Sequence, residues 1–197
     1  MPFSSLSDFV QLLAQRRELR RIAHPVKAEL EIAEIADRVM KKGGPALLFE
    51  NVSGKTIPVL INAFGSAKRM ALALGVDDLE QIAADIAKLI QLKPPRSFAE
   101  KLGLLRELMK LAGIPPKLVK DGPCREVIHR DPDLNMLPVL TCWPGDAGPF
   151  ITLPMVFSKD PVKGNRNVGL YRMQVFDRRT TGMHWHLHKV GARHFRQ

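Results

Sequence analysis

Hydrophobic residues recur at helical spacing through the first half of the chain. Residues 79–90 place Leu79, Ile82 and Ile86 at steps of three and four, which predicts an amphipathic helix. The same spacing predicts further helices, at residues 9–13, 32–40, 67–74 and after the capping box Ser97–Glu100. Short apolar runs between the first helices predict strands, at residues 18–24, 46–49 and 57–61. Helices and strands therefore alternate, which is typical of an α/β domain.

The pattern changes after a stretch rich in proline and glycine at residues 113–123. Two adjacent prolines in that stretch prevent a helix from continuing. Apolar runs then predict four strands separated by turn residues, at residues 125–129, 151–158, 168–177 and 182–188. Their spacing favours an antiparallel sheet or barrel over βαβ units. We therefore expect an α+β protein with two domains, residues 1–118 and 119–197, divided near residues 116–122.

Composition is that of a globular protein, but the charge is unevenly distributed. The 197 residues are 45% hydrophobic and 25% charged. No apolar run approaches the roughly 18 residues of a membrane span, and the start lacks a secretory signal, so we expect a cytoplasmic protein. The formal net charge is +10, and residues 161–197 hold eight basic residues against the single acid Asp177. This end favours phosphate, nucleic acid or an anionic substrate, although a solvated charged face has the same composition.

Two cysteines, Cys124 and Cys142, are too few for a disulfide framework and form no Cys-x-x-Cys motif. A pair of this kind stays reduced in a cytosolic protein. We predict that both are small, buried, apolar side chains.

Three histidines alternate near the C-terminal end: His184, His186 and His188. Alternate side chains share one face of a strand, so these imidazoles would point the same way and could surround a metal ion. Polar residues on an exposed strand face give the same pattern. Two interpretations without catalysis are therefore open. The histidines favour a His-x-His-x-His metal protein of cupin-like type, and the basic C-terminal end favours a module that binds nucleic acid.

Residues 166–172 form a second candidate segment. Asn167 offers an amide oxygen that suits a hard cation, and Gly169 would let a ligand approach the backbone closely. Arg172 offers a planar fork for a carboxylate or phosphate. Taken alone, this pattern also fits an ordinary strand that carries an exposed arginine.

Five segments together resemble the N-terminal part of UbiD-type decarboxylases, the 3-polyprenyl-4-hydroxybenzoate carboxy-lyases and their relatives. They follow one another along essentially the whole chain, at residues 44–52, 64–75, 143–152, 167–172 and 188–192. The resemblance implies a lyase that removes CO2 from an aromatic or α,β-unsaturated acid, often in ubiquinone or menaquinone biosynthesis. It also implies an N-terminal α/β domain followed by the first part of an FMN-binding split β-barrel.

The resemblance further implies roles for individual residues. Asn167 and His188 match the family's metal ligands, and Arg172 matches the catalytic arginine that meets the substrate carboxylate. The residues that match flavin contacts are Leu170, Tyr171, Arg172, His184, Trp185, His186, Lys189 and Val190. The implied cofactors are prenylated FMN, a divalent metal such as Mn²⁺, and K⁺.

The implied partners are an aromatic carboxylic acid as substrate and a flavin prenyltransferase as the source of the cofactor. A full-length chain would form a homo-oligomer, and a lipophilic substrate would bring it to the membrane periphery. Nucleic acid is not among the partners that the resemblance implies.

The sequence departs from the family pattern in two ways. Val190 stands where relatives often have the first of two glycines. The family's third metal ligand and its proton-transferring carboxylates are glutamates that lie later in a chain more than twice as long. The only acid after Arg172 is Asp177. We therefore expect an incomplete copy (a fragment, a truncation or one product of a split gene) that does not decarboxylate alone.

Overall fold

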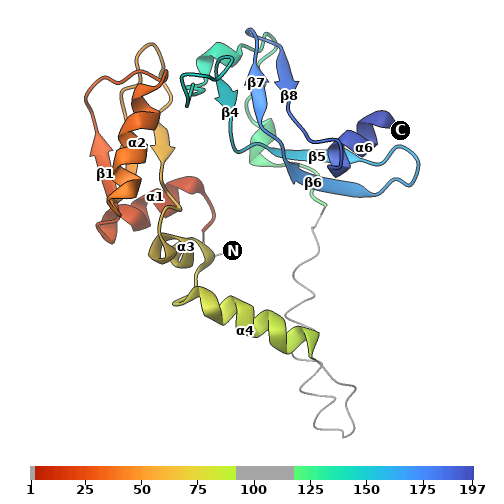
Figure 1. Ribbon diagram of the computed structural model, residues 1–197, viewed down its shortest axis with the longest axis horizontal. Helices are drawn as coiled ribbons and strands as arrows, with labels where there is room; N and C mark the ends of the chain where they lie inside the picture. Colours follow the sequence, from red (N-terminus) through yellow and green to blue (C-terminus); the bar gives the residue numbers. More distant parts are fainter. Residues whose placement is uncertain (1–2, 92–117) are drawn as a thin grey trace, which may run out of the picture. The chain divides into compact units, whose positions relative to one another are not determined.

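The computed structural model describes residues 3–91 and 118–197, coloured along the chain in Figure 1. Contacts divide them between two compact units, one with residues up to 75 and 132–197, the other within residues 76–131. The second unit contains helix α4 (Leu79–Ile90) and the short 3-10 helix η1 (Pro123–Arg125). Helix α4 confirms the prediction from apolar spacing. The capping box at residues 97–100 and the helix expected after it lie outside the described residues.

The larger unit begins with six elements, each at a predicted position. They are α1 (Leu6–Gln15), β1 (Leu19–Ile22), α2 (Glu31–Lys41), β2 (Ala46–Phe49), β3 (Val59–Ile61) and α3 (Ala67–Leu74). The strands form one sheet in the order β1-β2-β3. Strand β2 pairs in parallel with β1 and antiparallel with β3. This part confirms the predicted mixture of helices and strands.

Strand β2 is the centre of this part, because all four of its residues are buried. Leu47 and Phe49 belong to one apolar cluster with Ile32 of α2. Ala46 belongs to a second cluster with Phe9 of α1. Successive side chains of a strand point to opposite faces, so one strand supplies residues to both cores.

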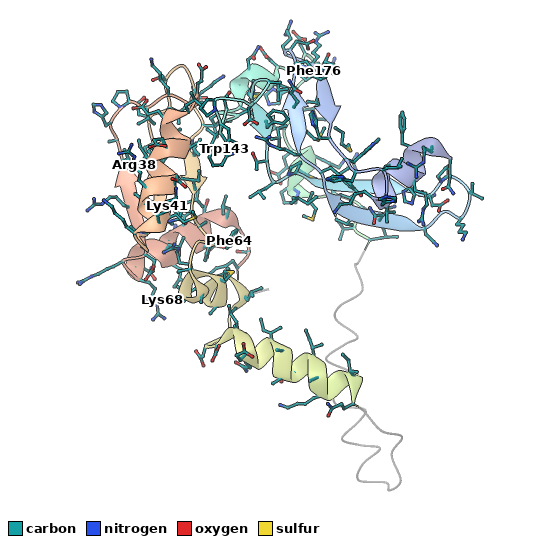
Figure 2. The ribbon with its side chains drawn as sticks, in the orientation of Figure 1. Arg38, Lys41, Phe64, Lys68, Trp143 and Phe176 are labelled. Carbon is teal, nitrogen blue, oxygen red and sulfur yellow. The ribbon has the colours of Figure 1, made fainter. Side chains whose placement is uncertain are left out.

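A charged residue is also buried here, which the sequence analysis did not anticipate. Arg69 of α3 is 1% exposed, and its Nη1 donates to Glu18 Oε2 at 3.0 Å. Lys68, which projects from α3 in Figure 2, pairs with Glu18 Oε1 at 2.6 Å. Within the described residues, the buried Nε and Nη2 of Arg69 have no hydrogen-bond partner. Glu18 therefore balances a buried cation between β1 and α3.

The second part of the larger unit contains short strands. They are β4 (Phe150–Ile151), β5 (Met155–Lys159), β6 (Arg166–Leu170), β7 (Met173–Val175) and β8 (Thr181–Met183), followed by α6 (Val190–Arg196). The 3-10 helix η2 (Leu134–Met136) precedes them. Strands β4, β7 and β8 form one antiparallel sheet, and β5 and β6 form a two-stranded hairpin. These described strands confirm antiparallel pairing, and they form no closed barrel.

Several predicted strands are wrong in extent or in type. The strand expected at residues 151–158 is interrupted at 152–154, where Pro154 has no N–H to donate to a ladder. The strand expected at residues 168–177 is divided between β6 and β7. Residues 125–129 form no strand, because Pro123 begins a 3-10 turn in which Arg125 N donates to Gly122 O at 2.9 Å.

Two other expectations are tested by burial and helix length. Cys124 is exposed and Cys142 is half-buried, so the prediction of two buried cysteines is wrong for Cys124 and incomplete for Cys142. Both are free thiols. Of the helices within residues 3–91 and 118–197, none has the length and apolar character that crossing a membrane requires.

Candidate functional site

The structure brings together the two segments that the sequence analysis selected. The backbone N–H of His184 donates to the carbonyl of Arg172 at 2.9 Å. The N–H of Gly191 donates to the hydroxyl of Tyr171 at 2.9 Å. The rings of Tyr171 and Trp185 meet edge to face, with centroids 6.2 Å apart. Residues 166–172 and 184–191 therefore lie side by side, although 11 residues separate them in the chain.

Tyr171 is the residue that joins these two segments. It is 4% exposed, and its ring occupies the space next to two glycines. A Cβ on Gly169 would lie 2.4 Å from a Tyr171 ring carbon, and a Cβ on Gly191 would lie 2.9 Å from another. Gly169 therefore makes room for a tyrosine ring, which differs from the expectation that it admits a ligand. Tyr171, expected to contact a flavin, is a buried part of the scaffold.

Arg172 follows strand β6, and its guanidinium is held on two sides. Nη1 and Nη2 donate to the two carboxylate oxygens of Asp146 at 2.9 and 2.7 Å. The guanidinium carbon lies 3.8 Å from the ring centroid of Phe150, a cation–π contact. The side chain of Arg172 is 33% exposed and that of Asp146 is 11% exposed. Arg172 is therefore oriented by an internal carboxylate and an aromatic face.

Charge and hydrogen bonding reinforce this pair. The hydrogen bond to Asp146 raises the pKa of Arg172, and the nearby Cys142 adds to the same effect. The hydrogen bond from Arg172 holds the pKa of Asp146 below its usual range, with support from the N–H of Trp143. Both groups are ionised at neutral pH, and the pair has no net charge.

The predicted metal ligands offer suitable atoms but an incomplete set. Asn167 lies on β6, and its Nδ2 is 3.5 Å from the Tyr171 hydroxyl, which leaves Oδ1 as a possible ligand. His188 lies exposed in the turn before α6. An amide oxygen and an imidazole suit a divalent cation. The described parts of the chain contain no group of three His, Cys, Asp or Glu side chains placed to hold a metal. Asn167 and His188 therefore offer suitable atom types, and their roles as metal ligands stay a prediction.

The prediction of three histidines on one strand face is wrong, because β8 ends at Met183. His184 packs edge to face on Phe150, with ring centroids 5.2 Å apart, and its Nε2 lies 3.3 Å from Gln174 Oε1. His186 and His188 follow in an irregular turn and are exposed. The geometry gives no support to a His-x-His-x-His metal site.

The remaining residues expected at a flavin lie around the same turn. Leu170 is 59% exposed at the end of β6. Trp185 is half-buried, with its ring centroid 5.5 Å from that of Phe195. Lys189 is exposed and precedes the first turn of α6, in which Val190 is half-buried. Exposed and aromatic side chains therefore border the segment that Tyr171 anchors.

Helix α6 is attached to the hairpin by a buried histidine that the sequence analysis missed. The side chain of His194 is 6% exposed, and Nδ1 lies 3.0 Å from Ser158 Oγ on β5. Its Nε2 lies 3.9 Å from Asp160, whose pKa is lowered mainly by the N–H of Lys163. These contacts fix the helix that follows the predicted metal-binding histidine.

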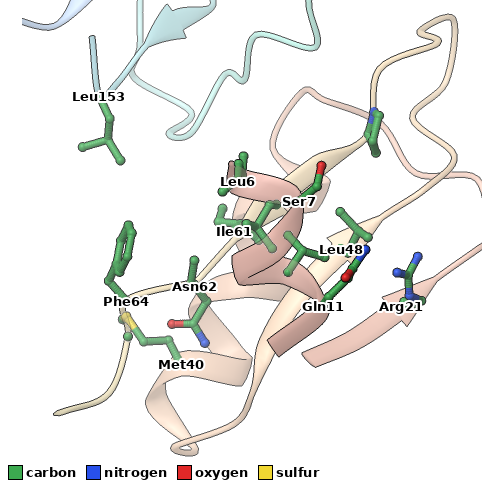
Figure 3. Close-up of a pocket in the computed structure, with 15 residues that line it drawn as sticks. Leu6, Ser7, Gln11, Arg21, Met40, Leu48, Ile61, Asn62, Phe64 and Leu153 are labelled. Carbon is green, nitrogen blue, oxygen red and sulfur yellow. The ribbon is translucent and has the colours of Figure 1, made fainter. Parts of the chain in front are cut away.

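Of two cavities, one lies away from the predicted site residues and one adjoins the partner of Arg172. Figure 3 shows a largely apolar cavity of about 820 Å³ near α1 and β3, with Leu6, Ile61 and Phe64 among its lining residues. No predicted site residue lines it. A second cavity, of about 420 Å³, is lined by Asp146 and by Trp143, which Figure 2 labels. The second cavity therefore adjoins the carboxylate that holds Arg172.

Two sequence-family models match the chain. The model of the 3-octaprenyl-4-hydroxybenzoate carboxy-lyase N-terminal domain matches residues 10–88. The model of the Rift-related domain of the same carboxy-lyases matches residues 117–197. The two models together cover most of the chain.

Relatives and solved structures agree with these matches. An uncharacterised protein of Archaeoglobus fulgidus is 46% identical over 200 residues, covering 100% of this chain and 40% of the relative. An uncharacterised protein of Aquifex aeolicus is 46% identical over 196 residues, covering 98% of this chain and 40% of the relative. The chain therefore spans about 40% of the length of these relatives.

Three solved structures have the same fold over nearly the whole chain. The UbiD-class enzyme HmfF from Pelotomaculum thermopropionicum, in complex with prFMN, gives a TM-score of 0.73 at 28% identity, covering 93% of this chain and 38% of HmfF. Vanillic acid decarboxylase from Sedimentibacter hydroxybenzoicus gives a TM-score of 0.75 at 28% identity, covering 98% of this chain and 39% of the decarboxylase. The 3,4-dihydroxybenzoic acid decarboxylase of Klebsiella pneumoniae gives a TM-score of 0.72 at 26% identity, covering 96% of this chain and 38% of that enzyme.

Both matching models describe domains of carboxy-lyases. The chain belongs to this family, the UbiD family, and corresponds to about 40% of the length of its relatives. Neither the nucleic-acid-binding module nor the cupin-like metal protein receives support from these comparisons or from the geometry.

Proposed function

We propose that this chain is the cofactor-binding and carboxylate-binding part of a UbiD-type decarboxylase that acts on an aromatic or α,β-unsaturated acid. The observation that carries the proposal is the adjacency of residues 166–172 and 184–191, held by Tyr171 and the Arg172 backbone. The solved structures of HmfF with prFMN and with FMN support a flavin as the cofactor. Vanillic acid and 3,4-dihydroxybenzoic acid, named for two related enzymes, support an aromatic acid as substrate.

The residues have distinct roles in this proposal. Asn167 Oδ1 and the His188 imidazole hold a divalent metal such as Mn²⁺, with K⁺ as a further ion. Leu170, Trp185 and Lys189 border the flavin, together with His184, His186 and Val190. Arg172 orients the substrate carboxylate through charge-assisted hydrogen bonds. Prenylated FMN, when bound, supplies the electron sink for decarboxylation.

The hairpin supports the proposal that the chain acts together with further polypeptide. Met155 pairs with Leu170, and Phe157 pairs with Val168, so these four side chains share one face. They are 68%, 59%, 59% and 50% exposed, respectively. An apolar face of this kind on a folded protein is typical of an interaction surface. The other three-fifths of the relatives' length is the occupant that we propose, with a homo-oligomer as the full assembly.

Binding of FMN with Mn²⁺ tests the proposed roles of Asn167 and His188. We expect flavin fluorescence to report FMN binding that requires Mn²⁺ and weakens about tenfold or more in Asn167→Ala and His188→Ala, because each removes a metal ligand. His129→Ala removes an exposed histidine outside the site and is the matched control. Equal affinity in all four proteins would contradict the proposed ligands.

Turnover tests whether the chain is sufficient. With prenylated FMN supplied by a flavin prenyltransferase, we expect no CO2 release from vanillate or 3,4-dihydroxybenzoate. The reason is that reprotonation of the product carbon needs a general acid, and the family's glutamates are not in this sequence. CO2 release by the purified 197-residue chain would refute this expectation.

We also propose the cytoplasm as the location and a quinone precursor among the possible substrates. A lipophilic substrate would place the enzyme at the membrane periphery. An evolved dimeric form of HmfF is known, and this supports the proposal that the full-length protein self-associates.

A further inference from the structure

Asp146 occupies one defined edge of the Arg172 guanidinium. Its two oxygens accept from Nη1 and Nη2, the outer pair of nitrogens, at 2.9 and 2.7 Å. A guanidinium has five N–H donors in a plane, and this end-on contact uses two of them. The second edge, formed by Nε–H and the other Nη2 hydrogen, also has the geometry for two parallel bonds to a carboxylate. Among the described residues, Asp146 is the carboxylate that hydrogen-bonds this guanidinium, through the end-on edge, and the side chain of Cys142 is a further hydrogen-bond partner.

The other surroundings restrict how Arg172 can turn. Phe150 covers one face of the guanidinium at 3.8 Å. Asp146 itself is fixed, because it also accepts from the backbone N–H of Trp143 at 3.2 Å. The backbone carbonyl of Arg172 is bound by His184 N–H. Rotation that presented the outer nitrogens to a ligand would break two short charge-assisted bonds at once.

We propose that Asp146 is a positioning residue that turns the Nε–Nη2 edge of Arg172 toward the substrate carboxylate. This inference rests on the proposed function and adds a residue to it. Asp146 places two N–H donors in a fixed direction, so a planar carboxylate binds to a preoriented edge and Asp146 remains in place. An alternative role, in which Asp146 only competes for the cation, predicts the opposite response to its removal.

Arginine side-chain NMR of the full 197-residue chain distinguishes these roles. We expect Arg172 in the wild type to give resolved, slowly exchanging Nη–H signals, because two of these protons are bound to Asp146. In Asp146→Asn these signals should collapse through rotation and exchange, and in Asp146→Glu they should be partly retained. Identical Arg172 signals in the wild type and Asp146→Asn would overturn the proposal.

Titration with benzoate, as a carboxylate probe, completes the test. We expect benzoate to shift the Arg172 Nε–H signal while the Asp146-bound signals persist, and affinity to fall about tenfold in Asp146→Asn, as for the loss of one charge-assisted bond. The role of Asp146 would be overturned, and the proposed function left standing, by either of two results. One is unchanged or tighter benzoate binding in Asp146→Asn, and the other is loss of the Asp146-bound signals as benzoate binds. No shift of Arg172 by benzoate in any variant would overturn the proposed function as well.

A charge control separates positioning from simple electrostatics. Glu50→Gln removes one negative charge from an exposed pair with Arg21 and leaves the Arg172 site intact. We expect its benzoate affinity and Arg172 signals to equal those of the wild type. Because this change makes the chain more positive, an effect of net charge alone would tighten benzoate binding. Equal tightening in Glu50→Gln and Asp146→Asn would show that net charge sets the affinity and would overturn the proposal.

Discussion

Glu18→Gln is expected to lower the free energy of unfolding by about 3 kcal/mol, the scale for breaking a buried ion pair from one side. Arg69 is 1% exposed, and Glu18 is the carboxylate that its Nη1 reaches. Glutamine keeps the size of the side chain but leaves the guanidinium charge unbalanced in a buried place. Because Nε and Nη2 of Arg69 have no partner among the described residues, nothing else there offsets the loss.

Urea unfolding measures this effect, and Lys68→Gln is the matched control. Lys68 binds the same carboxylate, but its side chain is 64% exposed. Exposed ion pairs contribute about 1 kcal/mol or less, so the control should stay close to the wild type. Equal losses in Glu18→Gln and Lys68→Gln would contradict the assignment of Arg69 as the buried cation that Glu18 balances.

The same experiment has a pH signature. Hydrogen bonds from Lys68 and then Arg69 lower the pKa of Glu18 from 4.5. A carboxyl with a lowered folded-state pKa contributes stability that is present above the unfolded value and lost as pH falls through the folded value. The stability difference between the wild type and Glu18→Gln should therefore be full above pH 4.5 and shrink below it. A difference that is independent of pH would contradict this account.

The second large effect concerns Tyr171. We expect Tyr171→Ala to lower the free energy of unfolding by about 3–5 kcal/mol, because it removes a buried ring and leaves a cavity. Tyr171→Phe keeps the ring but removes the acceptor of the Gly191 N–H, and should cost about 1–3 kcal/mol. Both variants should also change the fluorescence of Trp185, which contacts the Tyr171 ring.

Phe157→Ala is the control for loss of an aromatic ring. Phe157 is 59% exposed on the outer face of the hairpin, so its removal should change stability by about 0.5 kcal/mol or less. If Tyr171→Phe were as stable as the wild type with unchanged fluorescence, the link between the two site segments would not depend on the hydroxyl.

The first part of the fold could be predicted because its signals are local. The spacing in residues 79–90 and the all-apolar run 46–49 each contain enough information to define an element, and both are confirmed. Later strands are shorter than their apolar runs because Pro154 interrupts one run and the irregular residues 171–172 divide another between β6 and β7. Periodicity does not show where a ladder ends, which is why the three histidines were wrongly placed on one strand.

The site was predicted in part, for a related reason. The segments at 166–172 and 184–191 were found from their residues and from family resemblance. Asp146, 26 residues from Arg172, lies in the family-like segment 143–152, but no local pattern paired it with Arg172, because a turn and a distant strand end meet only in the folded chain. Arg69 was missed because a lone arginine in a helix gives no indication that it is buried. The assignment of individual ligands stays a prediction.

The internal neutralisation of Arg172 has a consequence for how an acid reaches the site. A cation paired with Asp146 produces little field beyond contact range, so it cannot attract an anion from bulk solution. That attraction falls to the remaining basic residues of 161–197, whose field weakens within a Debye length of about 8 Å at physiological salt. Added salt is therefore expected to lower the association rate of an anionic substrate more than its affinity for Arg172. Arg172 itself should distinguish ligands by the planar geometry of their carboxylate more than by their total charge.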